Sequence, residues 1–234
     1  MLELSTVKSI GIPEGNVAKI TNAAGHLLWE KRADDDFRNL YQRVEYITRK
    51  AGGGFFRTDF IANNQSGLEL SFSVPSFSDT ATMGSRASDS TNGRCYIFYP
   101  RAATVGYIGW NTAQSWSVST SADTRYTTRL NWLNSRKAVI LNADGTTKAT
   151  KSVSGTLVQQ TSPIDICSYN NGNGRAMSLY GARLSQDGEI VREYLPCYRK
   201  SDGVIGVYEM LTGEFLVSYN GGAFTKGPDV AWDA

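Results

Sequence analysis

Histidine is nearly missing from this sequence, and its scarcity limits the catalytic chemistry that the chain can carry. His26 is the only histidine among 234 residues, and it falls in a predicted turn near the N-terminus. A serine or cysteine triad needs an imidazole base beside its nucleophile, so the rest of the chain has no base for one. The sequence also lacks the G-x-x-x-x-G-K-S/T and G-x-G-x-x-G loops that cradle phosphate groups.

Closely spaced acids are scarce as well. A retaining glycosidase needs two carboxyl groups about 5–5.5 Å apart, which a strand supplies when two acids stand two residues apart on one face. Glu69 is alone on its predicted strand, while Glu189 and Glu193 are four residues apart. The acids at 34–36 lie in a predicted linker. We therefore expect no enzyme activity; the alternative is a glycan-cleaving enzyme with an unrecognised carboxylate pair.

Cysteines are few and long apolar runs are missing. Cys95, Cys167 and Cys197 are odd in number and far apart, so we expect reduced, buried thiols and no structural zinc. No run reaches the roughly 20 apolar residues of a membrane-spanning helix, and the N-terminus lacks the apolar core of a secretory signal. We expect cytoplasmic synthesis without a signal peptide and no membrane insertion.

Neither sign of charge dominates. The chain has 24 Lys and Arg against 22 Asp and Glu, a formal net charge of +2. The basic residues are scattered and form no stripe of the kind that binds nucleic acid, so we expect no nucleic-acid partner. The hydrophobic fraction of 41% is sufficient for a sizeable core.

Short alternating runs separated by turn residues make up most of the sequence. In the segment 67–74, GLELSFSV, Leu68, Leu70 and Phe72 fall on one face and polar residues on the other, which is typical of a half-buried strand. Asp-Gly pairs at 144–145, 187–188 and 202–203 suit tight hairpins. Further strands are predicted at 94–99, 105–110, 126–133, 137–141, 146–153, 164–169, 177–184, 190–198 and 204–208. The only helix candidate, at 34–41, is short, so the pattern predicts an all-β fold of two antiparallel sheets.

The N-terminal residues are set apart from this pattern. The segment 15–31, GNVAKITNAAGHLLWEK, is typical of a hairpin, and the charged KRADDD at 31–36 is typical of a linker. An isolated hairpin is barely stable in water, so we expect it to dock on the main domain or on another subunit. We therefore divide the chain into a hairpin segment with its linker, 1–36, and a sandwich domain, 37–234.

The C-terminal stretch carries the most specific motif. It reads GEIVREYLPCYRKSDGVIGVYEMLTGEF at 188–215 and GAFTKGP at 222–228. It closely resembles the ending of concanavalin A-like, laminin G-like jelly-roll proteins encoded in prophages and phage tail regions of gut bacteria. LYQRVEYI at 40–47 is similar to the first strand of that group, and the hairpin at 15–30 resembles a small module of phage tail proteins. The resemblance implies a jelly-roll sandwich on a virion tail among other tail proteins, and it implies no ligand. We interpret the charged residues of the stretch as closing the fold rather than gripping a partner.

Aromatic and polar residues gather between residues 94 and 117. Carbohydrate sites stack aromatic faces on sugar rings and place polar groups near the hydroxyls, although aromatics more often fill cores. We expect Trp110 and Trp116 to be exposed, in or beside a loop at 112–125, and Trp132 to be buried. Alternation places Tyr96 with Phe98 on one strand face and Ile97 with Tyr99 on the other, without deciding which face is core. The candidate ligand-binding residues are Trp110, Trp116, Tyr99, Tyr107, Asn111 and Arg101.

Calcium is the one cofactor for which the sequence offers candidate ligands. Loop oxygens of Asp and Asn can hold it, yet the same residues are common turn formers, so we expect no cofactor. The residues in question are Asp79, Asp89, Asn92, Asn170, Asn171 and Asn173.

Taken with the resemblance, these features lead to one functional hypothesis. We expect a non-catalytic, tail-associated protein whose domain binds a host-surface glycan or protein. A purely structural tail or baseplate component is the alternative, and homo-oligomerisation is left open.

Overall fold

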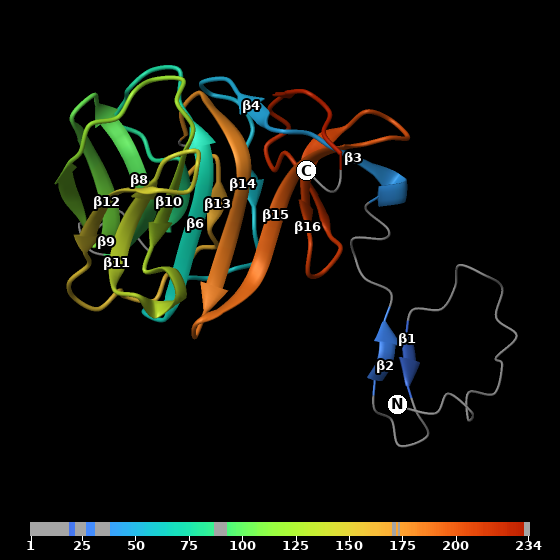
Figure 1. The fold of residues 1–234 in the computed structure, drawn as a ribbon, viewed down its shortest axis with the longest axis horizontal. Helices are drawn as coiled ribbons and strands as arrows, with labels where there is room; N and C mark the ends of the chain where they lie inside the picture. The colour runs from blue at the N-terminus through green and yellow to red at the C-terminus, as the bar shows by residue number, and fades with distance from the viewer. Residues whose placement is uncertain are drawn as a thin grey trace, which may run out of the picture.

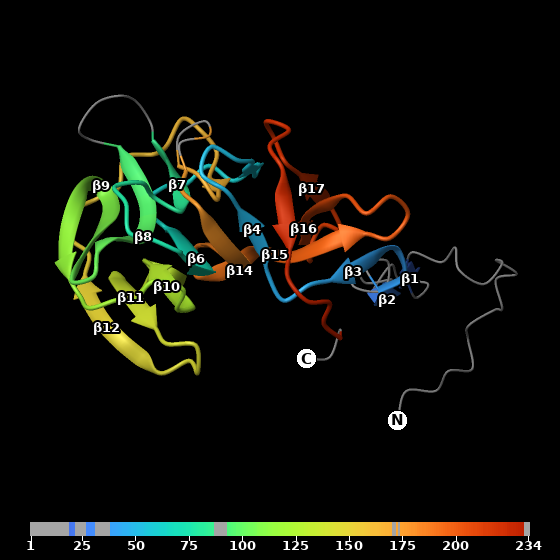
Figure 2. The same cartoon turned by 90° about the horizontal axis from the view of Figure 1, so that it is seen from above.

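The computed structural model describes residues 19–21, 27–30, 38–86, 93–169, 172 and 174–231. Almost all of the regular structure in these ranges is antiparallel β-sheet, and Figure 2 shows the two main layers of strands. The prediction of an all-β, two-sheet sandwich is confirmed; its jelly-roll topology stays a prediction. Of the helix candidate, residues 38–40 form one helical turn, and 34–37 lie outside the described residues. No helix in the described ranges is long and apolar enough to cross a bilayer.

The larger sheet has eleven strands (Figure 1). Its main path runs β12-β11-β10-β6-β14-β15-β16-β17, and β3, β4 and β18 attach to its side. The strands are β3 Tyr41–Arg43, β4 Ile47–Arg49, β6 Ser66–Ser73, β10 Tyr126–Leu130, β11 Lys137–Leu141, β12 Thr147–Ser152, β14 Met177–Gln186, β15 Glu189–Arg199, β16 Ile205–Glu209, β17 Phe215–Val217 and β18 Phe224–Lys226.

The smaller sheet has five strands in the order β5-β13-β7-β8-β9. They are β5 Phe56–Arg57, β13 Asp165–Ile166, β7 Met83–Arg86, β8 Arg94–Ala102 and β9 Val105–Ser117. A separate two-stranded sheet pairs β1 Lys19–Thr21 with β2 Leu27–Glu30, so the paired part of the predicted hairpin is confirmed. Its turn, with His26, and the linker before residue 38 lie outside the described residues.

The core lies between the two main sheets. Leu68, Leu70 and Phe72 of β6 are buried in it, as their spacing predicts, while Glu69 and Ser71 point to the opposite face because side chains alternate along a strand. The three cysteines are free and buried, as predicted. Burial raises the pKa of the Cys95 and Cys167 thiols to about 12.

The C-terminal motif forms the last strands of the larger sheet. Glu209 at the end of β16 is only 1% exposed, and its carboxylate accepts hydrogen bonds from the backbone N–H groups of Glu193 at 2.7 Å and Leu211 at 3.1 Å. Arg199 and Asp202 form an ion pair at 2.6 Å across the turn. These contacts tie the last strands and their turn to one another, which supports the interpretation that the motif closes the fold.

A β-bulge divides the residues of β8 in a way that simple alternation does not predict. Tyr96 and Tyr99 keep their partners on β9, while Ile97 and Phe98 between them stand opposite the single residue Ile108. One extra residue shifts the alternation by one position. Ile97 and Phe98 therefore both enter the main core, whereas Tyr96 and Tyr99 lie together in a separate cluster outside it.

The expectation of exposed tryptophans is wrong. Strand β9 continues to Ser117, so much of the predicted loop at 112–125 is strand. Trp110 and Trp116 stand an even number of residues after Ile108, on the face of β9 that packs into the core, and they are only 1% and 8% exposed. The expectation that Trp132 is buried is also wrong, because β10 ends at Leu130 and a turn leaves this indole half-buried.

Candidate functional site

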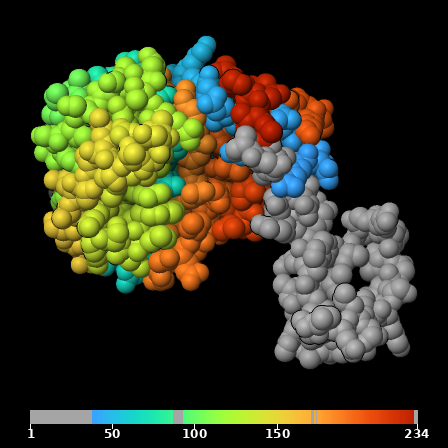
Figure 3. All heavy atoms as spheres, in the orientation of Figure 1, coloured from blue at the N-terminus to red at the C-terminus, as the bar shows by residue number. Residues whose placement is uncertain are grey.

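A hollow of ≈ 320 Å³ lies on the outer face of the larger sheet. We call it the groove. In Figure 3 a recess separates the green and yellow atoms of β10–β12 from the orange atoms of β14 and β15. Glu69 and Ser71 from β6 form part of its floor, since their neighbours in the strand face the core. Gly145, in the β11–β12 turn, and Arg43 from β3 line its sides.

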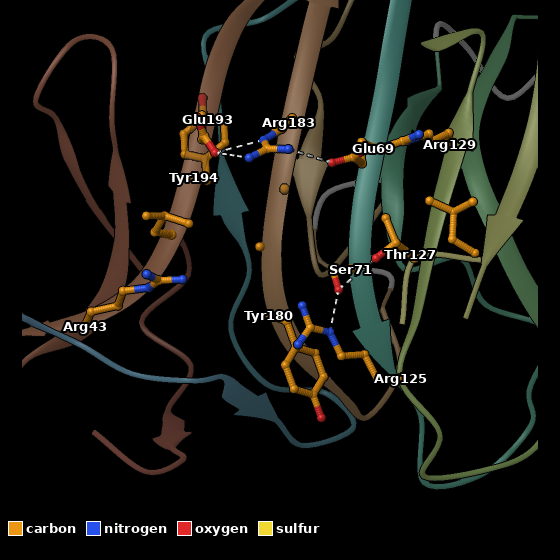
Figure 4. Close-up of a pocket in the computed structure, with 15 residues that line it drawn as sticks. Arg43, Glu69, Ser71, Arg125, Thr127, Arg129, Tyr180, Arg183, Glu193 and Tyr194 are labelled. Carbon is orange, nitrogen blue, oxygen red and sulfur yellow. Dashed lines mark hydrogen bonds and ion pairs between the residues drawn. The ribbon is translucent and has the colours of Figure 1, made fainter. Parts of the chain in front are cut away.

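Four charged side chains form a ladder across the groove (Figure 4). Arg129, Glu69, Arg183 and Glu193 stand in register on the neighbouring strands β10, β6, β14 and β15. The Glu69 carboxylate accepts from Arg129 Nε at 2.5 Å and from Arg183 Nη1 at 3.4 Å. Arg183 also donates to Glu193 Oε1, through Nη2 at 2.5 Å and Nε at 2.8 Å. Because opposite charges face each other directly, each link stabilises the pairing of its two strands.

The ladder holds its members in fixed positions and keeps Arg183 charged. Burial on its own would lower the pKa of Arg183, but the hydrogen bonds and negative charges of Glu193 and Glu69 outweigh it and raise that pKa overall. The guanidinium thus stays charged while it spans the two carboxylates. Groups that are fixed before a ligand arrives lose little freedom on binding.

Arg125 lies at another position in the groove, beside a pair of tyrosines. Its guanidinium carbon is 4.5 Å from the centre of the Tyr180 ring, and its Nε donates to Ser71 Oγ at 3.0 Å. The Tyr46 ring is 5.3 Å from that of Tyr180. Arg125 is exposed, and within the described ranges no carboxylate forms an ion pair with it. Its remaining donors point to a role in binding an acceptor from solution.

The groove does not offer the acid pair of a retaining glycosidase. Glu69 and Glu193 are the two carboxylates among the described residues that line it, and Arg183 bonds to both of them. A guanidinium therefore stands between the carboxyl groups, where the scissile bond would have to lie. The three side chains offer hydrogen-bond donors and acceptors to hydroxyl and anionic groups.

The residues predicted from the sequence fall outside the groove. Tyr99, Tyr107 and Arg101 come together on the outer face of the smaller sheet, where the two rings stack with centres 6.0 Å apart. Arg101 donates to the Tyr107 hydroxyl at 3.1 Å and pairs with Asp79 at 3.3 Å. The Tyr99 hydroxyl donates to Asp79 at 2.9 Å.

The remaining candidates divide between that face and the core. Asn111 stands opposite Arg94 in the sheet and accepts from the Gly93 N–H at 3.1 Å. Trp110 and Trp116 belong to the core and cannot stack on a sugar. Of the sequence candidates, the smaller sheet therefore brings together the two tyrosines and the arginine.

Asp79 is the one calcium candidate that can be placed, and it is engaged with Arg101 and Tyr99. The other five, Asp89, Asn92, Asn170, Asn171 and Asn173, lie outside the described residues. In the ranges that the structure covers, His, Cys, Asp and Glu side chains form no cluster of three that could hold a metal ion.

The residues of the groove escape sequence reasoning because they come from strands far apart in the chain. Glu69 and Arg183 are 114 positions apart and become neighbours only when β6 pairs with β14. The one local signal is that Glu69, Thr127 and Arg183 each alternate with buried residues, which marks outward-facing positions.

The chain was compared with protein families, curated proteins and solved structures. No family model matches it, and no curated protein or solved structure matches it either. The resemblance to concanavalin A-like phage proteins therefore stays a prediction from the motifs.

Proposed function

We propose that this chain is a non-catalytic, tail-associated phage or prophage protein that binds an acidic host-surface glycan in the groove of its larger sheet. The observation that carries the proposal is the charge of the groove. Among the described residues, its lining has four arginines, at 43, 125, 129 and 183, against two glutamates, at 69 and 193. Four positive charges minus two negative charges leave an excess of two positive charges, which favours an anionic ligand.

The size and polarity of the groove fit a carbohydrate. Its ≈ 320 Å³ is near the lower end of the roughly 300–1,000 Å³ range of ligand sites. Sugar hydroxyls both donate and accept hydrogen bonds, and the ladder offers fixed donors beside fixed acceptors. Arg125 adds a guanidinium that can pair with a carboxylate or phosphate group on the glycan.

The assignment to a tail rests on the sequence motifs. The two-stranded sheet of β1 and β2 is separate from both sheets of the sandwich. A lone hairpin gains stability when it pairs with or docks on a partner. This fits a role in attaching the sandwich domain to another tail protein.

The proposal is tested by mixing the full chain with purified acidic polysaccharide from bacterial surfaces. We expect the protein to co-sediment with the polysaccharide while the number of reducing ends stays constant. Release of new reducing ends that stops in Glu69→Gln or Glu193→Gln would show instead that the groove is catalytic. No retention by any polysaccharide, even at high protein concentration, would favour the purely structural tail component.

A further inference from the structure

A second and smaller hollow, of ≈ 150 Å³, lies on the smaller sheet. Arg86 and Arg94 line it together with Tyr96, Tyr99 and Tyr169. We call it the arginine–tyrosine pocket. It shares no residue with the groove, and its strands, β7 and β8, belong to the other sheet.

The register of the sheet places two guanidinium groups side by side in this pocket. Arg86 of β7 stands directly opposite Arg94 of β8, so the two side chains share one face of the sheet. Arg94 Nε is buried and has no hydrogen-bond acceptor among the described residues. A buried donor without a partner costs free energy, and an oxyanion beside Arg94 would remove that cost.

Among the described residues, Asp79 is the one carboxylate that lines the pocket, and it is already engaged. Asp79 pairs with Arg101 at 3.3 Å and accepts from the Tyr99 hydroxyl at 2.9 Å. The charge of Arg101 balances that of Asp79. The positive charge of Arg94 therefore still faces the hollow.

Two glycines give the pocket its shape. A Cβ at Gly109 would lie 2.5 Å from the Tyr96 ring, and one at Gly84 would lie 2.5 Å from the Tyr96 Cβ. A larger residue at Gly109 would push this ring away, and one at Gly84 would collide with the backbone of the strand that carries it. The Tyr169 ring meets it edge-on at 5.8 Å. Glycine at these two positions thus lets the Tyr96 ring lie next to the two arginines.

The tyrosines of the pocket remain neutral hydrogen-bonding groups. Burial raises the pKa of Tyr96 and of Tyr99, so both phenols stay protonated at neutral pH. A ligand therefore meets neutral aromatic rings beside positive guanidinium groups. This combination suits a ring that carries one anionic substituent.

We infer that the arginine–tyrosine pocket binds a single anionic sugar unit, with its carboxylate or phosphate group at Arg86 and Arg94 and its ring against Tyr96 and Tyr169. The site does not depend on the proposed function of the groove, because it uses other residues on the other sheet. It would give the protein a second point of recognition for an acidic surface.

Calorimetric titration of the full chain with glucuronate, glucose 6-phosphate and glucose tests the inference. Glucuronate and glucose 6-phosphate show whether the pocket takes a carboxylate or a phosphate group. Neutral glucose should show no measurable binding. We expect Arg94→Gln to weaken binding of the preferred anion about tenfold or more, because a charge-assisted hydrogen bond is lost. Arg136→Gln, which removes an exposed charge elsewhere, should bind the probe as the wild type does.

Thermal melting gives a readout that separates binding from folding. Arg94→Gln should melt near the wild-type temperature, since the buried Arg94 Nε has no hydrogen bond to a described residue that the substitution could remove. The preferred anion should raise the melting temperature of the wild type but not that of Arg94→Gln. Equal affinities of wild type and Arg94→Gln, or no heat and no thermal shift with either anion, would overturn the inference. Loss of binding in Arg125→Gln alone would assign the anion to the groove instead.

Discussion

Trp110 illustrates how an aromatic side chain in a polar stretch can belong to the core. Its indole is 1% exposed, and its Nε1 donates to the Gly155 carbonyl at 3.2 Å. The neighbouring Asn111 lies on the other face of the same strand, so the polar residues around Trp110 give no information about its burial. The two tryptophans of β9 belong to the core and stabilise the sandwich.

This role predicts a large effect on stability. We expect Trp110→Ala to lower the free energy of unfolding by about 3–5 kcal/mol, as for other buried aromatic residues, measured by urea denaturation. The matched control is Trp132→Ala, whose indole is half-buried and whose loss should cost less. An unchanged midpoint in Trp110→Ala, together with loss of glycan binding, would contradict the placement of this indole in the core.

The buried cysteines predict how stability depends on pH. Burial raises the pKa of Cys95 from 9.0 to about 12, so the folded state keeps the thiol neutral where the unfolded state ionises. Its contribution is fully present below pH 9 and is lost as the pH rises from 9 towards 12. The buried Tyr96 and Tyr194, whose pKa values burial also raises, act in the same direction at higher pH.

Urea denaturation at several alkaline pH values measures this dependence. We expect each buried thiol to remove up to about 1.4 kcal/mol of stability per pH unit within the window. The free energy of unfolding of Cys95→Ala should therefore fall less steeply with pH than that of the wild type. Because both proteins keep the tyrosines, the difference between the two slopes is due to the thiol. Identical slopes would indicate that Cys95 is not buried as a neutral thiol.

At the scale of elements, the bulge in β8 determines the face that its tyrosines occupy. Without the extra residue, Tyr96 and Tyr99 would point to opposite sides of the sheet. With it they share the outer face, where Gly109 of β9 leaves room for the Tyr96 ring. The arginine–tyrosine pocket therefore depends on one bulge and on glycine at two positions.

Gly109→Ala tests this arrangement. The new Cβ would lie 2.5 Å from the Tyr96 ring, and overpacking of this kind costs about 1–3 kcal/mol. Gly181→Ala is the control, because its Cβ would meet its nearest neighbour, the Tyr194 carbonyl oxygen, at 3.4 Å, an ordinary contact. We expect a lower melting temperature and altered near-ultraviolet circular dichroism for Gly109→Ala only. Equal melting of the two variants would count against the close packing of Tyr96.

Local patterns predict the strands well and their neighbours poorly. The alternation of Leu68, Leu70 and Phe72 predicts both the strand and its buried face, since that signal lies within one segment. The bulge at Ile97 and Phe98 leaves no mark in the sequence, because it depends on how β9 pairs with β8. The groove escapes prediction for the same reason. It forms because β6 lies between β10 and β14, and no local spacing specifies that strand order.

At the scale of the whole molecule, the two sheets present positive hollows on a chain that is almost neutral. The formal net charge is only +2, yet the groove alone has an excess of two positive charges. The described lining of the groove therefore has a positive excess as large as the net charge of the whole chain. An acidic glycan would be attracted to these hollows, and salt would weaken the attraction by screening it.

An array of acidic and neutral bacterial glycans, probed with wild type, Arg125→Gln and Arg136→Gln, tests binding in the groove most directly. The groove predicts that the wild type and Arg136→Gln retain the same acidic glycans. Arg125→Gln should bind them about ten- to a hundredfold more weakly, because a charged hydrogen-bond donor is lost. Equal binding by all three proteins, or retention of neutral glycans alone, would contradict the proposed site.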